Sequence, residues 1–332
     1  MGDLMHAVGY RKSLPVDDPE SLVDAEVPVP TPGRHELLVR VEAVSVNPAD
    51  VKTRVNADPH GFRILGNDAA GVVTAVGPEV TRFAVGDEVY YAGPADRPGS
   101  DAEFQVVSEN IVGHKPASLD FADAAALPVT TVTAWEILFD HFGLAEADTG
   151  TLLMVGAAGG VGSMVLQLAR ARTDLTVLGT AARGDSQRWA TEMGAQHIID
   201  RHDLVGAVRA VAPDGVDYIV SPFSRGNIDN YAAVIRPFGH IAATDEPEGL
   251  DLLPLKAKSV SWHWELIFTR PVLLPDDPYQ HDLLEETAKL VDAGKLRSTA
   301  TTRLGPLDAN TLREAHARVE SSATIGKVVV TR

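Results

Sequence analysis

The amino-acid sequence predicts an α/β protein in which a β-rich, barrel-like N-terminal part precedes a doubly wound parallel sheet. Short strand-like segments separated by proline and glycine fill residues 1–127. From residue 151 onward, strands and helices alternate, and the strands are apolar throughout, as is typical of parallel strands buried on both faces. A glycine-dense turn joins the first of these strands to a helix.

The N-terminal segment supplies the strands of the barrel. We expect strands at residues 37–46, 70–77, 88–91 and 103–107. Pro28, Pro30, Pro32, Gly33 and Gly86 provide turns before and between them. A compact, partly closed barrel is a natural package for such strands.

The pattern changes at Pro128, which suits the first position of a helix; residues 133–142 continue this helix, and Gly143 ends it. The predicted strands that follow are 151–155, 176–180, 197–199, 216–220, 240–243 and 259–264. The helices between them are predicted at 185–193, 203–211 and 229–235. After Pro271 we expect helices at 282–292 and 308–320 and a last strand at 327–331.

The segment from Thr151 to Gly162 joins a strand, a tight turn and a helix N-terminus. Free backbone N–H groups and the positive end of the helix dipole point at one spot there, which suits a pyrophosphate if no side chain blocks its approach. Ala157 stands where the first glycine of G-x-G-x-x-G belongs. The flanking strand and helix nevertheless favour dinucleotide binding over a merely tight connection.

Composition limits the class of protein. The 332 residues are enough for two domains, and contents of 45% hydrophobic and 23% charged residues are ordinary for a globular protein. No apolar run approaches the roughly 20 residues of a membrane span, and the N-terminus does not resemble a secretory signal. We therefore expect a cytoplasmic protein that does not act in membranes.

Charge and cysteine content exclude further classes. A net charge of −17 argues against a nucleic-acid partner, because phosphate binding needs a basic surface. The absence of cysteine excludes disulfides, thiolate nucleophiles and cysteine-based zinc sites.

The order of motifs along the chain resembles the medium-chain dehydrogenase/reductase superfamily, within it the zinc-free quinone oxidoreductase-like branch. The pieces that carry the resemblance are 46–50 (VNPAD), 66–71 (GNDAAG), 86–89 (GDEV), 128–135 (PVTTVTAW), 156–162 (GAAGGVG) and 326–327 (GK). They recur in the family's order over nearly the whole chain.

The resemblance implies a fold, domains and a cofactor. We expect a discontinuous GroES-like catalytic domain, residues 1–127 and 271–332, and a Rossmann domain, residues 128–270, with a nicotinamide dinucleotide in the cleft between them. The implied cofactor-binding residues are Asn47, Thr133, Ala158, Gly159, Gly160, Val161, Gly162, Thr180, Arg183 and Lys327.

Zinc-dependent relatives hold a catalytic zinc with two cysteines and a histidine. The corresponding positions fall at Asn47, Asn67 and about Val129, whose side chains are two amides and an aliphatic group. The sequence therefore predicts an enzyme without zinc.

The end of the second Rossmann strand indicates the choice of cofactor. A carboxylate there accepts from the free 2′-hydroxyl of NAD, whereas Arg183 is placed to pair with the 2′-phosphate of NADP. We therefore predict that the protein prefers NADPH to NADH. Two features leave the alternative open: Asp185 is a carboxylate close to this strand end, and Arg183 can instead be a solvated loop residue.

Candidate catalytic residues are Lys52, Asn67 and Tyr91. Lys52 stands where relatives carry a proton-relay histidine or a tyrosine, and an ordinary surface lysine is the alternative. Asn67 replaces a zinc-binding histidine, so its amide is expected to donate to a substrate carbonyl. Tyr91 is a second possible donor, with a packed aromatic as the alternative.

These features predict reduction of a quinone or an activated C=C bond, because hydrogen-bond donors can stabilise the charge that develops on a distant oxygen. The rival interpretation is that a protein of the same fold carries out no redox reaction and is a lyase, a cyclase or a nucleotide-sensing protein. The aromatic segment 262–270 suggests the edge of a homodimer, with core packing as the alternative.

Overall fold

The chain folds into two units that are described separately. The structure is a computed structural model that describes residues 3–56, 58–182 and 184–332. The first unit comprises Met1–Val132 and Phe268–Arg332, and the second comprises Thr133–Ile267. The boundaries predicted from the sequence are 127/128 and 270/271.

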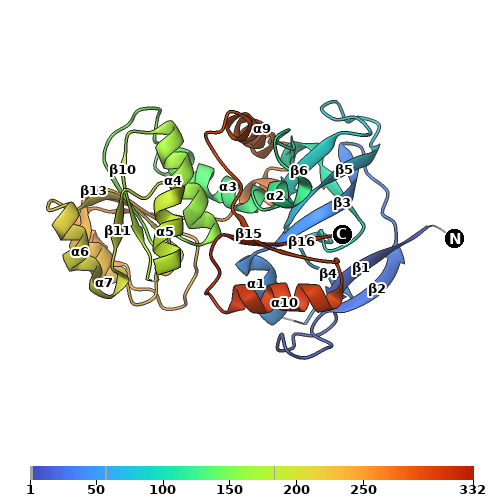
Figure 1. The fold of residues 1–332 in the computed structure, drawn as a ribbon, viewed down its shortest axis with the longest axis horizontal. Coiled ribbons are helices and arrows are strands. Elements are labelled where there is room, and N and C mark those ends of the chain that lie inside the picture. The colour runs from blue at the N-terminus through green and yellow to red at the C-terminus, as the bar shows by residue number, and fades with distance from the viewer. Residues whose placement is uncertain (1–2, 57, 183) are drawn as a thin grey trace. The chain divides into compact units, whose positions relative to one another are not determined.

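Strands from both ends of the chain build the first unit (Figure 1). Its main sheet has the order β15-β16-β3-β5-β6-β8, β7 pairs with β3, and a smaller sheet has the order β2-β1-β4. The strands are β1 (Leu4–Tyr10), β2 (Val23–Pro28), β3 (Glu36–Val46), β4 (Arg63–Ile64), β5 (Asp68–Val76), β6 (Glu88–Ala92), β7 (Phe104–Ser108), β8 (Val112–His114), β15 (Ala300–Leu304) and β16 (Lys327–Thr331). The helices are α1 (Pro48–Asn56), α2 (Phe121–Ala125), α8 (Thr269–Leu273), α9 (Tyr279–Asp292) and α10 (Ala309–Glu320), and α3 (Pro128–Trp135) crosses into the second unit.

The long strand β3 shows why this unit forms. Leu37, Val39 and Val41 alternate with less buried residues, so one face of the strand enters the hydrophobic core. β16 pairs with β3 antiparallel, with Val328 opposite Val46, so the last strand of the chain completes a sheet begun by the N-terminal segment.

The second unit is a parallel sheet of order β11-β10-β9-β12-β13-β14. Its strands are β9 (Thr151–Met154), β10 (Thr176–Thr180), β11 (His197–Ile199), β12 (Val216–Ser221), β13 (Ile235–Ala243) and β14 (Ser261–Trp264). Its helices are α4 (Gly160–Arg172), α5 (Gly184–Met193), α6 (Leu204–Val211) and α7 (Ile228–Val234). α4 and α5 cover one face of the sheet, and α6 and α7 cover the other (Figure 1). This is the doubly wound α/β fold that the sequence predicts.

The helix expected at residues 133–142 differs in form. α3 ends at Trp135, and Glu136–His141 continues as a π-helix before Gly143, which has a φ of 65°. The glycine ends the helix as predicted, because this backbone conformation is unfavourable for other residues. β13 also starts five residues earlier than the predicted 240.

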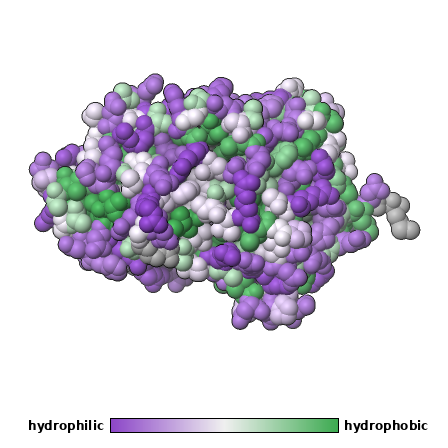
Figure 2. All heavy atoms as spheres, viewed as in Figure 1, coloured by the Kyte–Doolittle hydropathy of each residue, from purple (hydrophilic) through white to green (hydrophobic). Residues whose placement is uncertain are grey.

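Two observations concern the surface. Within the described ranges, no helix is long and apolar enough to cross a membrane. On the face drawn in Figure 2, hydrophobic residues form scattered patches among hydrophilic ones.

Candidate functional site

The glycine turn after β9 is held in place by the end of β10. The Gly156 amide donates to Thr180 Oγ1 at 2.8 Å, and the Ala157 amide donates to the Thr180 carbonyl oxygen at 3.1 Å. Gly156 has a φ of 74°, a conformation that suits glycine. Thr180 therefore shapes the turn with both its side chain and its backbone.

Gly162 and Gly159 are glycines for different reasons. A Cβ built on Gly162 would lie 2.5 Å from the Gly156 carbonyl oxygen and 2.8 Å from backbone carbon atoms of Ala157, so close packing of helix on turn requires glycine. A Cβ built on Gly159 meets nothing closer than 3.5 Å, and its φ of −76° suits any residue. Nothing within the described protein requires glycine at 159, whereas a ligand that approaches the backbone there would.

The N-terminus of α4 offers donors at the same place. Gly159 is the N-cap and has no side chain to accept from the first amides of this 13-residue helix. Ala158 precedes this N-cap, and Gly160 and Val161 are the first two residues of the helix. The free N–H groups and the helix dipole make this turn fit an anionic diphosphate.

The tip of β10 lies beside this turn, and no carboxylate occupies residues 180–182 there. Arg183 lies outside the described residues, so its predicted role stays a prediction. Asp185 Oδ1 accepts from the Ser186 amide at 2.8 Å, within the first turn of α5. No motif marks Arg188, whose Nη1 would lie 3.7 Å from a Cβ built on Gly184, the first residue of α5.

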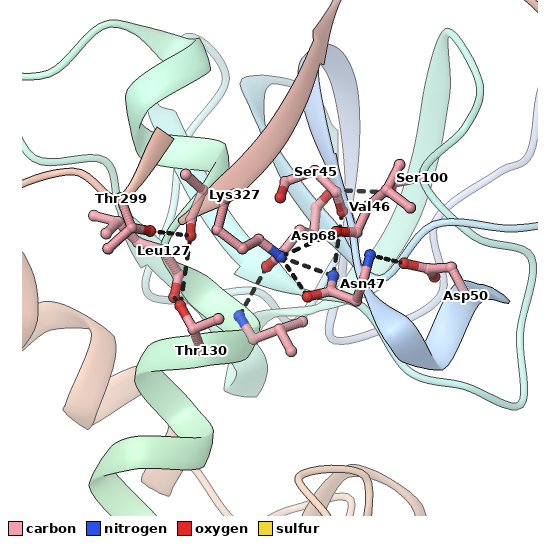
Figure 3. Close-up of polar contacts among 12 residues, drawn as sticks. Ser45, Val46, Asn47, Asp50, Asp68, Ser100, Leu127, Thr130, Thr299 and Lys327 are labelled. Carbon is pink, nitrogen blue, oxygen red and sulfur yellow. Dashed lines mark hydrogen bonds and ion pairs between the residues drawn. The ribbon is translucent and has the colours of Figure 1, made fainter. Parts of the chain in front are cut away.

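A buried polar network joins residues of β16, β5 and the end of β3 in the first unit (Figure 3). Lys327 Nζ donates to Asp68 Oδ2 at 2.9 Å, to the Val46 carbonyl oxygen at 3.3 Å and to Asn47 Oδ1. Asp68 Oδ1 accepts from the Val129 amide at 2.8 Å. Strand β16 thus carries a cation to a carboxylate on β5.

Both polar atoms of the Asn47 side chain make hydrogen bonds within this network. Its Nδ2 donates to Asp68 Oδ2 at 2.9 Å and to the Ser45 carbonyl oxygen at 3.2 Å, while its oxygen accepts from Lys327. The amide and the Lys327 ammonium are therefore both used internally. Their predicted contacts with the cofactor stay predictions, and the geometry gives them a structural role.

Two buried carboxyl groups lie near this network. Asp50 accepts from the Asn47 amide at 2.7 Å, and burial raises the pKa of Asp50 to about 7. Asp101 is also buried, and its carboxyl group packs against Gly66: a Cβ built on Gly66 would lie 2.7 Å from Asp101 Oδ1. Burial, with the neighbouring charge of Asp50, raises the pKa of Asp101 well above its ordinary value. Sequence analysis missed Asp101, because no motif marks it.

The predicted catalytic residues differ in accessibility. Asn67 lies next to Gly66 and is nearly buried, and its amide makes one long hydrogen bond, 3.4 Å, to the Gly93 carbonyl oxygen. Lys52 is exposed on α1. Tyr91 is fully buried in the hydrophobic core, and its hydroxyl makes no hydrogen bond within the described structure. Burial also raises its pKa.

Thr133, the remaining predicted cofactor residue, is nearly buried on α3. Among the residues that the structure describes, no group of three or more histidines, cysteines and carboxylates is arranged to hold a metal ion. The side chains at Asn47, Asn67 and Val129 are also poor zinc ligands.

Comparisons with known proteins identify the family of this chain. The model of the alcohol dehydrogenase GroES-like domain matches residues 33–128, and the model of the zinc-binding dehydrogenase family matches residues 193–330. A zinc-type alcohol dehydrogenase-like protein of Staphylococcus epidermidis is 36% identical over 98% of this chain and 99% of its own length. A quinone oxidoreductase of Lama guanicoe is 30% identical over 71% of this chain and 72% of its own length.

The fold also matches solved structures. A crystal structure described as a zinc-dependent alcohol dehydrogenase protein from Rhizobium etli CFN 42 has a TM-score of 0.96 and 46% identity, covering 100% of this chain and 99% of that one.

Proposed function

Because this chain belongs to the medium-chain dehydrogenase/reductase superfamily, an oxidoreductase family, we propose that it reduces a quinone or an activated C=C bond with NADPH and without zinc. The observation that carries the proposal is Gly159. The open space over its Cα position, beside the free amides of α4, suits a diphosphate that must touch the backbone. The quinone acceptor is supported by the relative of that name.

NADPH is proposed over NADH for two reasons. The strand tip at residues 180–182 carries no carboxylate that would repel a 2′-phosphate. Arg188 lies close to the first residue of α5, where its guanidinium can pair with that phosphate, and Arg183 is a second candidate from the sequence.

When bound, the nicotinamide supplies a hydride. Reduction of an enone also needs a proton at the α-carbon and donors to the carbonyl oxygen, where charge develops. We assign the hydrogen bond to the amide of Asn67, because its Nδ2 makes only a long contact, 3.4 Å, to the Gly93 carbonyl oxygen among the residues that the structure describes. Asp101 is the proposed source of the proton, because burial, together with the neighbouring charge of Asp50, raises the pKa of this carboxyl group and so favours its protonated form. Lys52 is the alternative proton donor.

Binding and turnover test the proposal together. Calorimetry is expected to show NADPH binding more tightly than NADH. A panel of quinones and enones is expected to oxidise NADPH, and with an enone the deuterium of labelled NADPH should appear on a carbon atom of the product. Binding without turnover or isotope transfer would favour the rival non-redox or nucleotide-sensing function. Failure of both dinucleotides to bind would overturn the proposal.

We also propose a homodimer that forms along β14. This strand ends the order of the parallel sheet, and Trp264 is half exposed there, with Leu266 exposed just beyond it. An open strand edge next to exposed apolar side chains is a surface that a second copy can extend.

A further inference from the structure

We propose that Phe223 packs against the nicotinamide riboside half of a bound dinucleotide and fixes its position. This inference rests on the proposed function, since it assumes that a dinucleotide binds at the glycine turn. It adds a residue that no motif in the sequence indicates. Phe223 lies two residues beyond Ser221, the last residue of β12, and is 52% exposed.

The ring lies beside the glycine turn. A Cβ built on Gly156 would lie 3.0 Å from Cε2 of Phe223 and 3.5 Å from Cγ of Pro222. The exposed ring is therefore an immediate neighbour of the residues proposed to bind the diphosphate. Any dinucleotide held by α4 must pass close to it.

The backbone of Phe223 is fixed on both sides. Its amide donates to Ser221 Oγ at 3.1 Å, and its carbonyl oxygen accepts from the Tyr231 hydroxyl at 3.0 Å and from Asn227 Nδ2 at 2.8 Å. The Ser221 and Tyr231 hydroxyls are hydrogen-bonded to each other at 2.7 Å, and both side chains are fully buried.

The residue that follows is anchored as well. Ser224 donates to Asp245 from its amide and from its hydroxyl, each at 2.6 Å. The exposure of the ring is thus built into the loop and does not result from a loose segment. A ring held in place before binding loses little conformational entropy when it packs against a ligand.

The strand order indicates which half of the dinucleotide meets this ring. In the order β10-β9-β12, the glycine turn follows the middle strand, and the adenosine half lies toward the tip of β10 in a doubly wound sheet. The other half then extends past the tip of β12, where Phe223 lies. A planar nicotinamide ring or its ribose can pack against the phenyl face, and such contacts contribute measurably to binding.

The test compares two ligands and two phenylalanine variants. NADPH contains both halves, whereas 2′,5′-ADP contains only the half assigned to β10. Phe223→Ala is expected to weaken NADPH binding by about ten-fold and to leave 2′,5′-ADP binding unchanged, as measured by calorimetry. Phe238→Ala is the matched control, because Phe238 is an exposed phenylalanine of the same unit, and it should change neither affinity.

Each other result has a defined meaning. Unchanged NADPH binding by Phe223→Ala overturns the inference, as does an equal loss for both ligands. If the wild-type protein binds neither ligand, the proposed function itself fails. A spectroscopic readout is independent of affinity: the fluorescence of bound NADPH should differ between wild type and Phe223→Ala at saturating ligand.

Discussion

At the scale of single residues, Gly162 and Gly159 are expected to have different roles: Gly162 is needed for stability, and Gly159 for cofactor binding. Gly162→Ala is expected to lower the free energy of unfolding by about 1–3 kcal/mol, because the added Cβ overlaps the backbone of Gly156 and Ala157. Gly159→Ala should leave the unfolding transition unchanged and weaken NADPH binding by at least about ten-fold, since the methyl group fills the space proposed for the diphosphate. Urea unfolding and calorimetry measure the two effects. An unstable Gly159→Ala, or one with normal affinity, would contradict this assignment.

Arg188 allows a second test at this scale. Arg188→Ala is expected to weaken NADPH binding by about ten-fold and to leave NADH binding unchanged, because a charge-assisted hydrogen bond to the 2′-phosphate is lost. Arg201→Ala, which removes another exposed arginine of the same unit, serves as the control. A parallel loss for both dinucleotides would show that Arg188 does not discriminate between them.

At the scale of elements, the pair between β5 and β16 predicts strong coupling. Lys327→Met leaves the carboxylate of Asp68 buried without its cation, which is expected to cost about 3–5 kcal/mol of unfolding free energy. Asp68→Asn in the same chain should restore part of this loss, because the uncompensated charge is gone. Urea unfolding of the two single variants and the double variant measures the coupling, and strict additivity would contradict it.

The contact between α1 and α10 predicts a pH dependence. Burial, and then the nearby Arg54, lowers the pKa of His316 to about 3. The unfolded chain takes up this proton near pH 6.5, whereas the folded chain does so only near pH 3, so stability falls as pH falls through that window. His316→Gln should show a weaker loss of unfolding free energy between pH 6.5 and 4, with a difference of at most about 1.4 kcal/mol per pH unit. Equal slopes for both proteins would contradict the prediction.

Helices and strands with a clear hydrophobic pattern or a capping residue can be predicted from the sequence, and those without one cannot. The strands β9, β10 and β12 have mostly apolar, largely buried residues, and Asp308 caps α10 by accepting from the Thr311 amide at 2.8 Å. β2 alternates acidic and apolar residues without a buried face, and α1 is short and polar, so neither stands out from a loop in the sequence. The π-helical turn at 136–141 also has no sequence pattern that distinguishes it from an α-helix.

At the scale of the whole molecule, the edge strand predicts self-association. Trp264→Glu is expected to shift the protein from dimer to monomer in sedimentation velocity, because a charge replaces a half-exposed indole at the end of β14. Leu253→Glu changes an exposed leucine outside the strand and is the control. A monomeric wild-type protein at micromolar concentration would refute the proposed dimer.

The sequence could predict the order of motifs over the chain, but not the partners of individual side chains. Gly159 and Gly162 are found by their spacing along a strand, turn and helix. Lys327 and Asn47 are placed near a site by resemblance, yet only the fold shows that they bind each other and Asp68. Asp101, Arg188 and Phe223 belong to no motif, because their significance depends on neighbours that are distant or unmarked in the sequence.

The contacts of β16 with β3 and β5 have a consequence for the order of folding. Lys327 and Asn47 are 280 residues apart in the sequence, and Lys327 and Asp68 are 259 residues apart. Closing so long a loop costs conformational entropy before the contacts can offset it. Until the two segments meet, Asp68 has no ammonium group to neutralise it, and β3 lacks a neighbour along one edge. The main sheet of the first unit is therefore expected to be completed in a late step of folding.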